Sequence, residues 1–240
     1  MAKLKGEILD FDKVFGSWAS NKEFRHFLNS EYFKKLLIFV DKSYSTGKLF
    51  PKKRDVFKIF RDIAYNDIKV IILEDKPYTS DRSMGLAYAN DDDTIITSPC
   101  LDKIVDVIEK DTDKIIINFD ITLKHWVEQG VFLYNTDLTT EAGMVNTQLN
   151  LWKPFTDFVL NFIIDNNPGI IFCLWGSKNL STFDKFIKED KLKFAYKLIS
   201  DHPVDSVNNK AIWNCEHFKQ VNEILENQNG KEFCIKWESN

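Results

Sequence analysis

The sequence lacks the features that mark several large classes of protein. Its four cysteines include no pair at the spacing of metal ligands, which predicts free thiols in a reducing compartment and no metal site. No apolar run approaches the length of a membrane-spanning helix, and no signal peptide is visible at the first residues. We therefore expect an intracellular, cytoplasmic protein that contacts no membrane and uses no cofactor.

An excess of basic charge is also missing, since 32 Lys and Arg face 36 Asp and Glu, for a formal net charge of −4. This balance gives no overall basic footprint for nucleic acid. Internal repeats and low-complexity linkers are absent. With 240 residues, 44% of them apolar, the chain suits a single domain over 1–240, with 1–47 as a helical N-terminal arm. We expect a monomer.

Three apolar runs predict strands buried within a sheet, Ile68–Leu73, Val131–Tyr134 and Ile170–Trp175, and Lys193–Ile199 is predicted as a fourth strand. Helical spacing fills the intervals between them, as in the stripe from Leu101 to Ile108. This alternation predicts an α/β fold with three αβα layers around a central, four-stranded, mainly parallel sheet. In such a sheet, ligands bind at the carboxyl ends of the strands, which draws attention to residues 74–79.

Prolines and glycines suggest where several helices begin and end. Pro154 is expected to start the helix that carries Phe155–Phe162, because proline fits the first helical position. A short helix over Leu123–Gln129 should end at Gly130, and the last helix should end near Gly230.

The loop after the first predicted strand reads Glu-Asp-Lys-Pro-Tyr-Thr over 74–79. The stretch resembles the signature loop Gly-Gln-Asp-Pro-Tyr-His of the family 1 uracil-DNA glycosylases. Only Pro77 and Tyr78 match, and Lys76 holds the place of the water-positioning aspartate. Two further stretches, LKHWVEQGVFLYNTDLT and Leu-Trp-Gly-Ser before residue 178, resemble later signatures of the same family. The resemblance extends over about 48–237.

The resemblance implies a pocket for a uracil flipped out of DNA. Tyr88 takes the place of the stacking phenylalanine, and Asn135 that of the asparagine that reads the base. His202 takes the place of the histidine that hydrogen-bonds the base oxygen. Tyr78 matches the tyrosine that excludes a 5-methyl group. Taken singly, each could be an ordinary semi-buried or loop residue.

Lys76 reverses the sign of the charge expected beneath the sugar. A unit charge at 4 Å is worth about 4 kcal/mol at an effective dielectric constant of 20, so the reversal amounts to roughly 8 kcal/mol. If Lys76 is instead an insertion, Asp75 takes the aspartate's place. Both registers remain open at this point.

The residues implied to contact DNA are altered as well. Ser177 keeps its phosphate-contacting identity, and Cys100 stands for a serine of the proline-rich loop. Ser206 has the place of the leucine that wedges into the duplex, but it is too small for that role. Six acids and two bases between residues 74 and 93 would repel phosphates, an effect that Lys210 could offset locally.

Three hypotheses follow. The leading one is a uracil-DNA-glycosylase-like protein that keeps its pyrimidine pocket, binds uracil-containing or modified DNA, and has lost or weakened hydrolysis, so that it is not an efficient enzyme. The second is an active uracil-DNA glycosylase that uses Asp75. The third is a protein-protein interaction module that reuses the fold, since some viral relatives of the family also serve as polymerase processivity partners.

Overall fold

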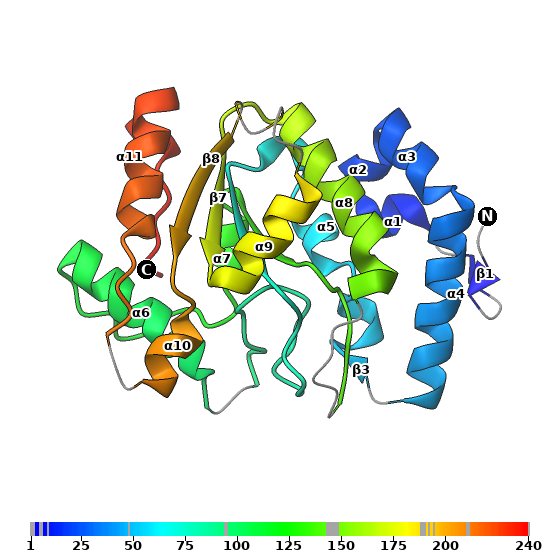
Figure 1. Ribbon diagram of the computed structural model, residues 1–240, viewed down its shortest axis with the longest axis horizontal. Helices are drawn as coiled ribbons and strands as arrows, with labels where there is room; N and C mark the ends of the chain where they lie inside the picture. Colours follow the sequence, from blue (N-terminus) through cyan, green and yellow to red (C-terminus); the bar gives the residue numbers. More distant parts are fainter. Residues whose placement is uncertain are drawn as a thin grey trace.

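A four-stranded parallel sheet forms the centre of the molecule (Figure 1). The computed structural model describes residues 3–4, 7–8, 10–47, 49–93, 96–142, 149–187, 191, 193, 195–209 and 212–239. The strands, in their spatial order, are β5 (Val131–Asn135), β4 (Val70–Glu74), β7 (Ile170–Trp175) and β8 (Ala195–Ser200). All neighbouring strands run parallel, so the predicted fold class is confirmed.

Burial differs between the two edge strands of the sheet, β5 and β8. Every residue of β5 and β7 is buried, as the uninterrupted apolar runs predict. The edge strand β8 instead leaves Tyr196 and Ile199 about half exposed. Two small antiparallel ribbons complete the strands described: β1 (Lys3–Leu4) with β2 (Glu7–Ile8), and β3 (Leu49–Phe50) with β6 (Thr140–Glu141).

Helices cover both faces of the sheet (Figure 1). In chain order they are α1 (Phe11–Phe15), α2 (Ser17–Ser20), α3 (Lys22–Leu28), α4 (Glu31–Thr46), α5 (Lys58–Asp62), α6 (Pro99–Thr112), α7 (Lys124–Val127), α8 (Leu149–Asn166), α9 (Ser177–Phe186), α10 (Pro203–Asn208) and α11 (His217–Asn229). Short 3₁₀ turns lie at Lys53–Asp55, Tyr65–Asp67 and Lys231–Phe233. As predicted, α11 ends at Gly230.

An aromatic cluster joins the first helices to one face of the sheet. Its members, all buried, are Phe15, Trp18, Phe24, Phe60 and Phe132. The Phe60 ring lies 5.0 Å from Trp18 and 5.7 Å from Phe132 on β5, between ring centroids. Phe15 packs against Phe60 at 5.4 Å. The helices within 1–47 therefore pack into the same core as the central sheet.

The C-terminal segment closes the other face beside α7. The Trp126 indole donates to the Trp237 carbonyl at 2.8 Å, and the two rings lie 5.1 Å apart. Gln129 exchanges two hydrogen bonds with the backbone of Lys236, at 2.8 and 2.9 Å. Phe218 of α11 packs on Trp237 at 5.0 Å. We call these contacts of Trp126 and Gln129 with Lys236 and Trp237 the tail seam. They hold α7 in place, and α7 leads into β5.

The prediction that α8 starts at Pro154 is wrong. The helix already begins at Leu149, so Pro154 lies inside it. The Tyr32 hydroxyl donates to the Leu151 carbonyl at 2.7 Å and accepts from the Phe155 amide at 3.2 Å. It thus stands between two groups that an undisturbed helix would join directly. A polar side chain inserted from α4 lets the helix continue past its proline.

Candidate functional site

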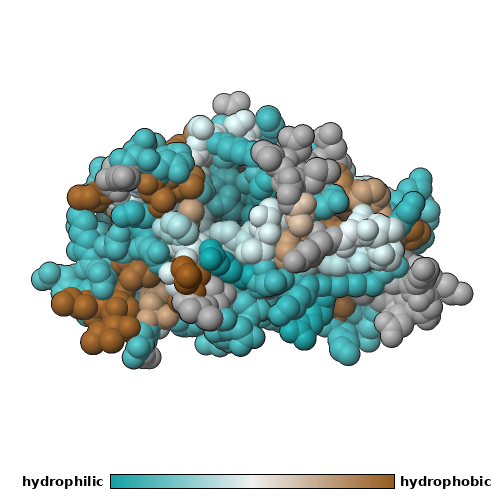
Figure 2. All heavy atoms as spheres, turned by 90° about the horizontal axis from the view of Figure 1, so that it is seen from below, coloured by the Kyte–Doolittle hydropathy of each residue, from teal (hydrophilic) through white to brown (hydrophobic). Residues whose placement is uncertain are grey.

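The candidate site lies at the carboxyl ends of β4 and β7, at the lower edge of the molecule in Figure 1. A pocket of about 260 Å³ opens there, and Glu74, Asp75, Trp175, Lys178 and His202 are among the residues that line it. Figure 2 looks onto this edge and shows a mainly hydrophilic surface. The sheet thus collects polar groups from separate parts of the sequence where an open α/β sheet binds ligands.

His202 is held on both sides of its ring. It precedes α10, and its Nδ1 accepts a hydrogen bond from the Val204 amide at 3.0 Å. Its Nε2 lies 2.9 Å from Oε2 of Glu74 and 3.2 Å from the hydroxyl of Tyr88. The backbone approaches closely here, because a Cβ added at Gly176 would stand 2.8 Å from the Cβ of His202. Glycine at 176 is therefore required for this position of the imidazole.

Tyr88 lies beside the histidine, with 5.9 Å between the ring centroids, and Tyr78 is hydrogen-bonded to the backbone of Tyr88. Tyr88 is buried, has a positive φ of 62°, and packs against Trp175 with 5.0 Å between ring centroids. The hydroxyl of Tyr78 lies 2.7 Å from Oγ of Ser98 and donates to the Tyr88 carbonyl at 3.2 Å. Burial raises the pKa of both phenols well above their usual value, so both hydroxyls stay neutral.

Several buried oxygen atoms at the site lack a hydrogen-bond partner among the described residues. They are Oδ1 of Asp75, Oδ1 of Asn135 and Oδ1 of Asn179. Asn135 stands opposite Glu74 in the register of β5 and β4, and 2% of it is exposed. An unpaired buried acceptor costs about 1–3 kcal/mol, so each of these oxygens can be stabilised by a water or a ligand that donates to it.

Asp75 is the buried carboxylate of the pocket, with 8% of the residue exposed. Its Oδ2 forms an ion pair with Nζ of Lys178, which reaches in from the first turn of α9. Its carbonyl accepts from Oγ1 of Thr136 and from the amide of Asp137, each at 3.0 Å. The backbone at Asp75 is therefore fixed by the segment that follows β5.

Lys76 takes a different place. It is partly buried and does not belong to the lining of this pocket, although its neighbours Glu74 and Asp75 do. The residues of β4 and its following loop that line the pocket are therefore the acidic Glu74 and Asp75, and not Lys76.

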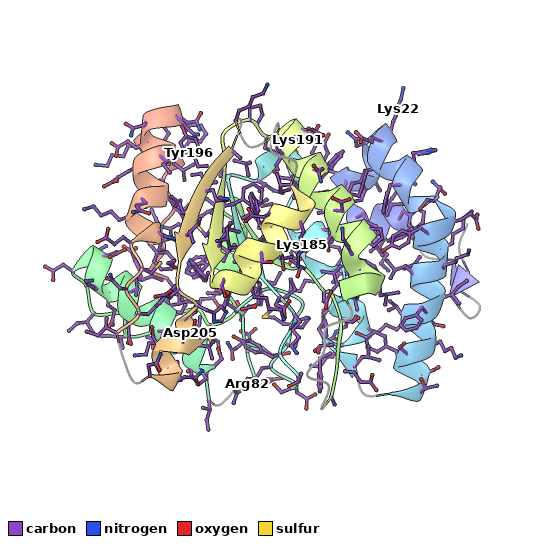
Figure 3. The ribbon with its side chains drawn as sticks, in the orientation of Figure 1. Lys22, Arg82, Lys185, Lys191, Tyr196 and Asp205 are labelled. Carbon is purple, nitrogen blue, oxygen red and sulfur yellow. The ribbon has the colours of Figure 1, made fainter. Side chains whose placement is uncertain are left out.

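The residues expected to contact DNA lie in different environments. Ser177 is exposed at the start of α9, whereas Ser206 is buried in α10 with 7% exposed. Cys100 is partly buried in α6, and burial, with the Glu74 charge next, raises the pKa of its thiol to about 12. Lys210 lies outside the described residues. On this edge Val204 is exposed beside Asp205, which Figure 3 labels on α10.

The acidic residues between 74 and 93 are partly neutralised by lysines from other segments. Nζ of Lys52 lies 3.4 Å from Asp91, and Nζ of Lys124 lies 3.3 Å from Asp92. A second hollow of about 710 Å³ is lined by Lys52, Asp91 and Arg82 among others, and Figure 3 labels Arg82 at the lower edge. Counting charges within 74–93 therefore overstates the negative potential that a phosphate would meet.

Reading the sequence missed three residues of the pocket: Glu74, Lys178 and Asn179. Asn179 donates to the carbonyls of Leu73 and Trp175, at 3.1 and 2.8 Å, and so ties α9 to two strands. The available signal was position alone, since Glu74 ends β4 and the other two lie in the first turn of α9, just after β7.

Two other kinds of site are absent from the described residues. In that part of the chain, no helix combines the length and apolar character of a membrane span. No cluster of three or more His, Cys, Asp or Glu side chains within the same ranges could hold a metal ion.

Comparison with known proteins gives a consistent set of relatives, although no family model matches the chain. The uracil-DNA glycosylase of Aliarcobacter butzleri is 34% identical over 203 residues, covering 84% of this chain and 92% of the relative. That of Borreliella burgdorferi is 36% identical over 224 residues, covering 90% and 96%. The crystal structure of mimivirus uracil-DNA glycosylase superposes with a TM-score of 0.77 at 22% identity, covering 90% of this chain and 84% of that one; this likeness concerns the fold.

Proposed function

Because the chain belongs to the uracil-DNA glycosylase family, we propose that it removes uracil from DNA and that Asp75 supplies the negative charge beneath the sugar. The relatives are named as glycosylases, which favours this hypothesis over the leading expectation from the sequence, a protein that binds uracil without cleaving it. The leaning toward a protein that is not an enzyme has no support among these relatives.

The observation that carries the proposal is the carboxylate of Asp75. It is buried at the pocket, and its Oδ1 has no hydrogen-bond partner among the described residues. Breaking the glycosidic bond leaves positive charge on the sugar, and a carboxylate at about 4 Å stabilises such a charge by about 4 kcal/mol at an effective dielectric constant of 20. The same oxygen can accept a proton from the attacking water.

The other groups supply recognition of the base. Tyr88 with Trp175 offers an aromatic wall for the flipped pyrimidine. The unpaired Oδ1 of Asn135 can accept the N3–H of uracil. His202 can donate to the base oxygen on which negative charge develops as the bond breaks.

Lys178 gives the site a link to the DNA backbone. Its ammonium pairs with Asp75, yet 61% of its side chain is exposed. A phosphate that docks beside Ser177, at the start of α9, would compete for this ammonium. The loss of the ion pair on DNA binding would leave the negative charge of Asp75 unneutralised when the glycosidic bond breaks.

Single-turnover release of uracil from a single-stranded oligonucleotide tests the proposal. We expect the wild type to release uracil and Asp75→Asn to be at least about a hundredfold slower, since preorganised electrostatic groups contribute on that scale. Lys76→Ala is the matched control next to it in the chain, and it should keep most of the activity. Inert wild-type protein, together with activity gained in Lys76→Asp, would overturn the assignment of Asp75.

One observation favours a second function, binding without cleavage. The ion pair with Lys178 neutralises Asp75 in the absence of DNA. If this pair persists in the complex, the protein would hold uracil-containing strands and leave them intact. Equal affinity for strands with and without uracil would argue against both functions and in favour of the interaction module, as would binding that salt does not weaken.

A further inference from the structure

The starting observation is that both ring nitrogens of His202 are engaged. Nδ1 accepts from the Val204 amide at 3.0 Å, so this nitrogen carries a lone pair and no hydrogen. The proton of the neutral imidazole therefore lies on Nε2. The nearest acceptor is Oε2 of Glu74 at 2.9 Å, a carboxylate oxygen, whereas the neutral Tyr88 hydroxyl lies farther away at 3.2 Å. The single N–H of His202 is thus donated to Glu74.

Glu74 is itself fixed in this position. Its second oxygen, Oε1, accepts from the Asp75 amide at 2.6 Å. About 19% of its side chain is exposed, and it lines the same pocket as His202. Its carboxylate therefore occupies the place where an oxygen of the base would have to stand to receive the His202 N–H.

We propose that Glu74 competes with the base for His202 and thereby sets how tightly the pocket holds uracil. This inference rests on the proposed function, because it assigns His202 as the donor to the base. To accept that hydrogen bond, the base must displace Glu74, which breaks a charge-assisted contact. Glu74 is a positioning residue in this scheme, since it acts on the base through His202.

Charge strengthens the competition after the bond has broken. Uracil departs as an anion, and the Glu74 carboxylate remains within the pocket beside His202. Repulsion between these two negative groups weakens the complex with the uracil anion and favours its release. Glu74 thus lowers the affinity for the product. It also reduces the stabilisation of the leaving group as the bond breaks.

The test measures binding of free uracil by titration calorimetry to the wild type, Glu74→Gln and Glu74→Gly. Glutamine keeps an acceptor oxygen without the charge, whereas glycine removes both. Because hydrogen bonds to charged groups are worth about 1.5–3 kcal/mol, we expect Glu74→Gly to bind uracil at least about tenfold more tightly than the wild type. Glu74→Gln should be intermediate. Asp205→Asn is the charge-matched control on the pocket rim, and it should change the affinity much less.

A second measurement follows His202 itself by nitrogen-15 NMR of its ring. In the wild type, uracil should shift the Nε2 signal only at concentrations that displace Glu74, and in Glu74→Gly at about tenfold lower ones. Uracil affinity that is unchanged in both Glu74 variants, or absent in all proteins, would overturn the inference. If no protein releases uracil from DNA but Glu74→Gly binds it more tightly, the proposed hydrolysis fails and the inference stands. If the wild type releases uracil from DNA and all three proteins bind free uracil with equal affinity, the proposed hydrolysis stands and the inference about Glu74 fails.

Discussion

The aromatic cluster and the pocket bury side chains in different ways. The cluster packs phenylalanine rings and the Trp18 ring around Phe60, and the Trp18 indole donates to the Ile63 carbonyl at 2.8 Å. The pocket, with the neighbouring end of β5, buries Asp75, Asn135 and Asn179, each with an oxygen that has no partner among the described residues. The first region therefore stabilises the fold with its contacts satisfied, whereas the second holds acceptors that a bound molecule would satisfy.

This difference predicts that stability resides mainly in the cluster. Phe60→Ala should lower the free energy of unfolding by about 4 kcal/mol, because it leaves a cavity where Phe60 met Phe15, Trp18 and Phe132. Urea denaturation measures the loss. Phe39→Ala, on the exposed side of α4 with 48% of the residue accessible, is the control and should cost less than about 1 kcal/mol. Equal losses in the two variants would contradict the comparison.

His217 supports the wall of the pocket, because its Nδ1 accepts a hydrogen bond at 3.0 Å from the indole of Trp175, which lines the pocket. Burial lowers the pKa of His217 from 6.5 to about 4, so the unfolded chain binds this proton more readily than the folded one. Stability should therefore fall as pH drops from 6.5 toward 4, by about 3 kcal/mol from this group.

His217→Gln keeps an acceptor for Trp175 and removes the titration. Urea denaturation at pH 7 and pH 4 should show a decrease about 3 kcal/mol smaller in His217→Gln than in the wild type. Parallel decreases in the two proteins would mean that His217 is protonated while the protein stays folded.

The smallest expected change in the free energy of unfolding concerns Asn135, next to the pocket. Asn135→Leu removes a buried oxygen that has no partner among the described residues, so it should raise the free energy of unfolding by about 1 kcal/mol while abolishing uracil binding. Asn90 is the control, because its amide donates to the Tyr88 carbonyl and its oxygen accepts from the Ser98 amide, both at 3.2 Å. Asn90→Leu should destabilise the protein. Similar losses of stability in both variants would show that Asn135 is satisfied after all.

The strands could be predicted from the sequence because their signal is local. An unbroken apolar run such as Ile170–Trp175 can only be buried on both faces, and the structure gives the same bounds. The interior position of Pro154 could not be predicted in this way, because it depends on the hydroxyl of Tyr32 in another helix. The family resemblance is confirmed by the relatives, whereas the roles of Tyr88, Asn135 and His202 remain predictions.

The contacts within the pocket required the structure, because they join residues far apart in the chain. Glu74 and His202 are separated by 128 positions, and Asp75 and Lys178 by 103. No periodic pattern in the sequence indicates which carboxylate pairs with which basic side chain. Position at a strand end was enough to draw attention to residues 74–79, but the proposal that Asp75 rather than Lys76 supplies the negative charge rests on which of the two residues lines the pocket.

The tail seam affects when the protein can finish folding during its synthesis. Trp126 and Trp237 are 111 positions apart, and α7 leads straight into β5 and Asn135. A growing polypeptide cannot form this pairing until Trp237 has left the ribosome, so β5, with Asn135 at its end, stays incompletely supported until then. The site proposed at the end of β5 should therefore form only after translation has passed Trp237.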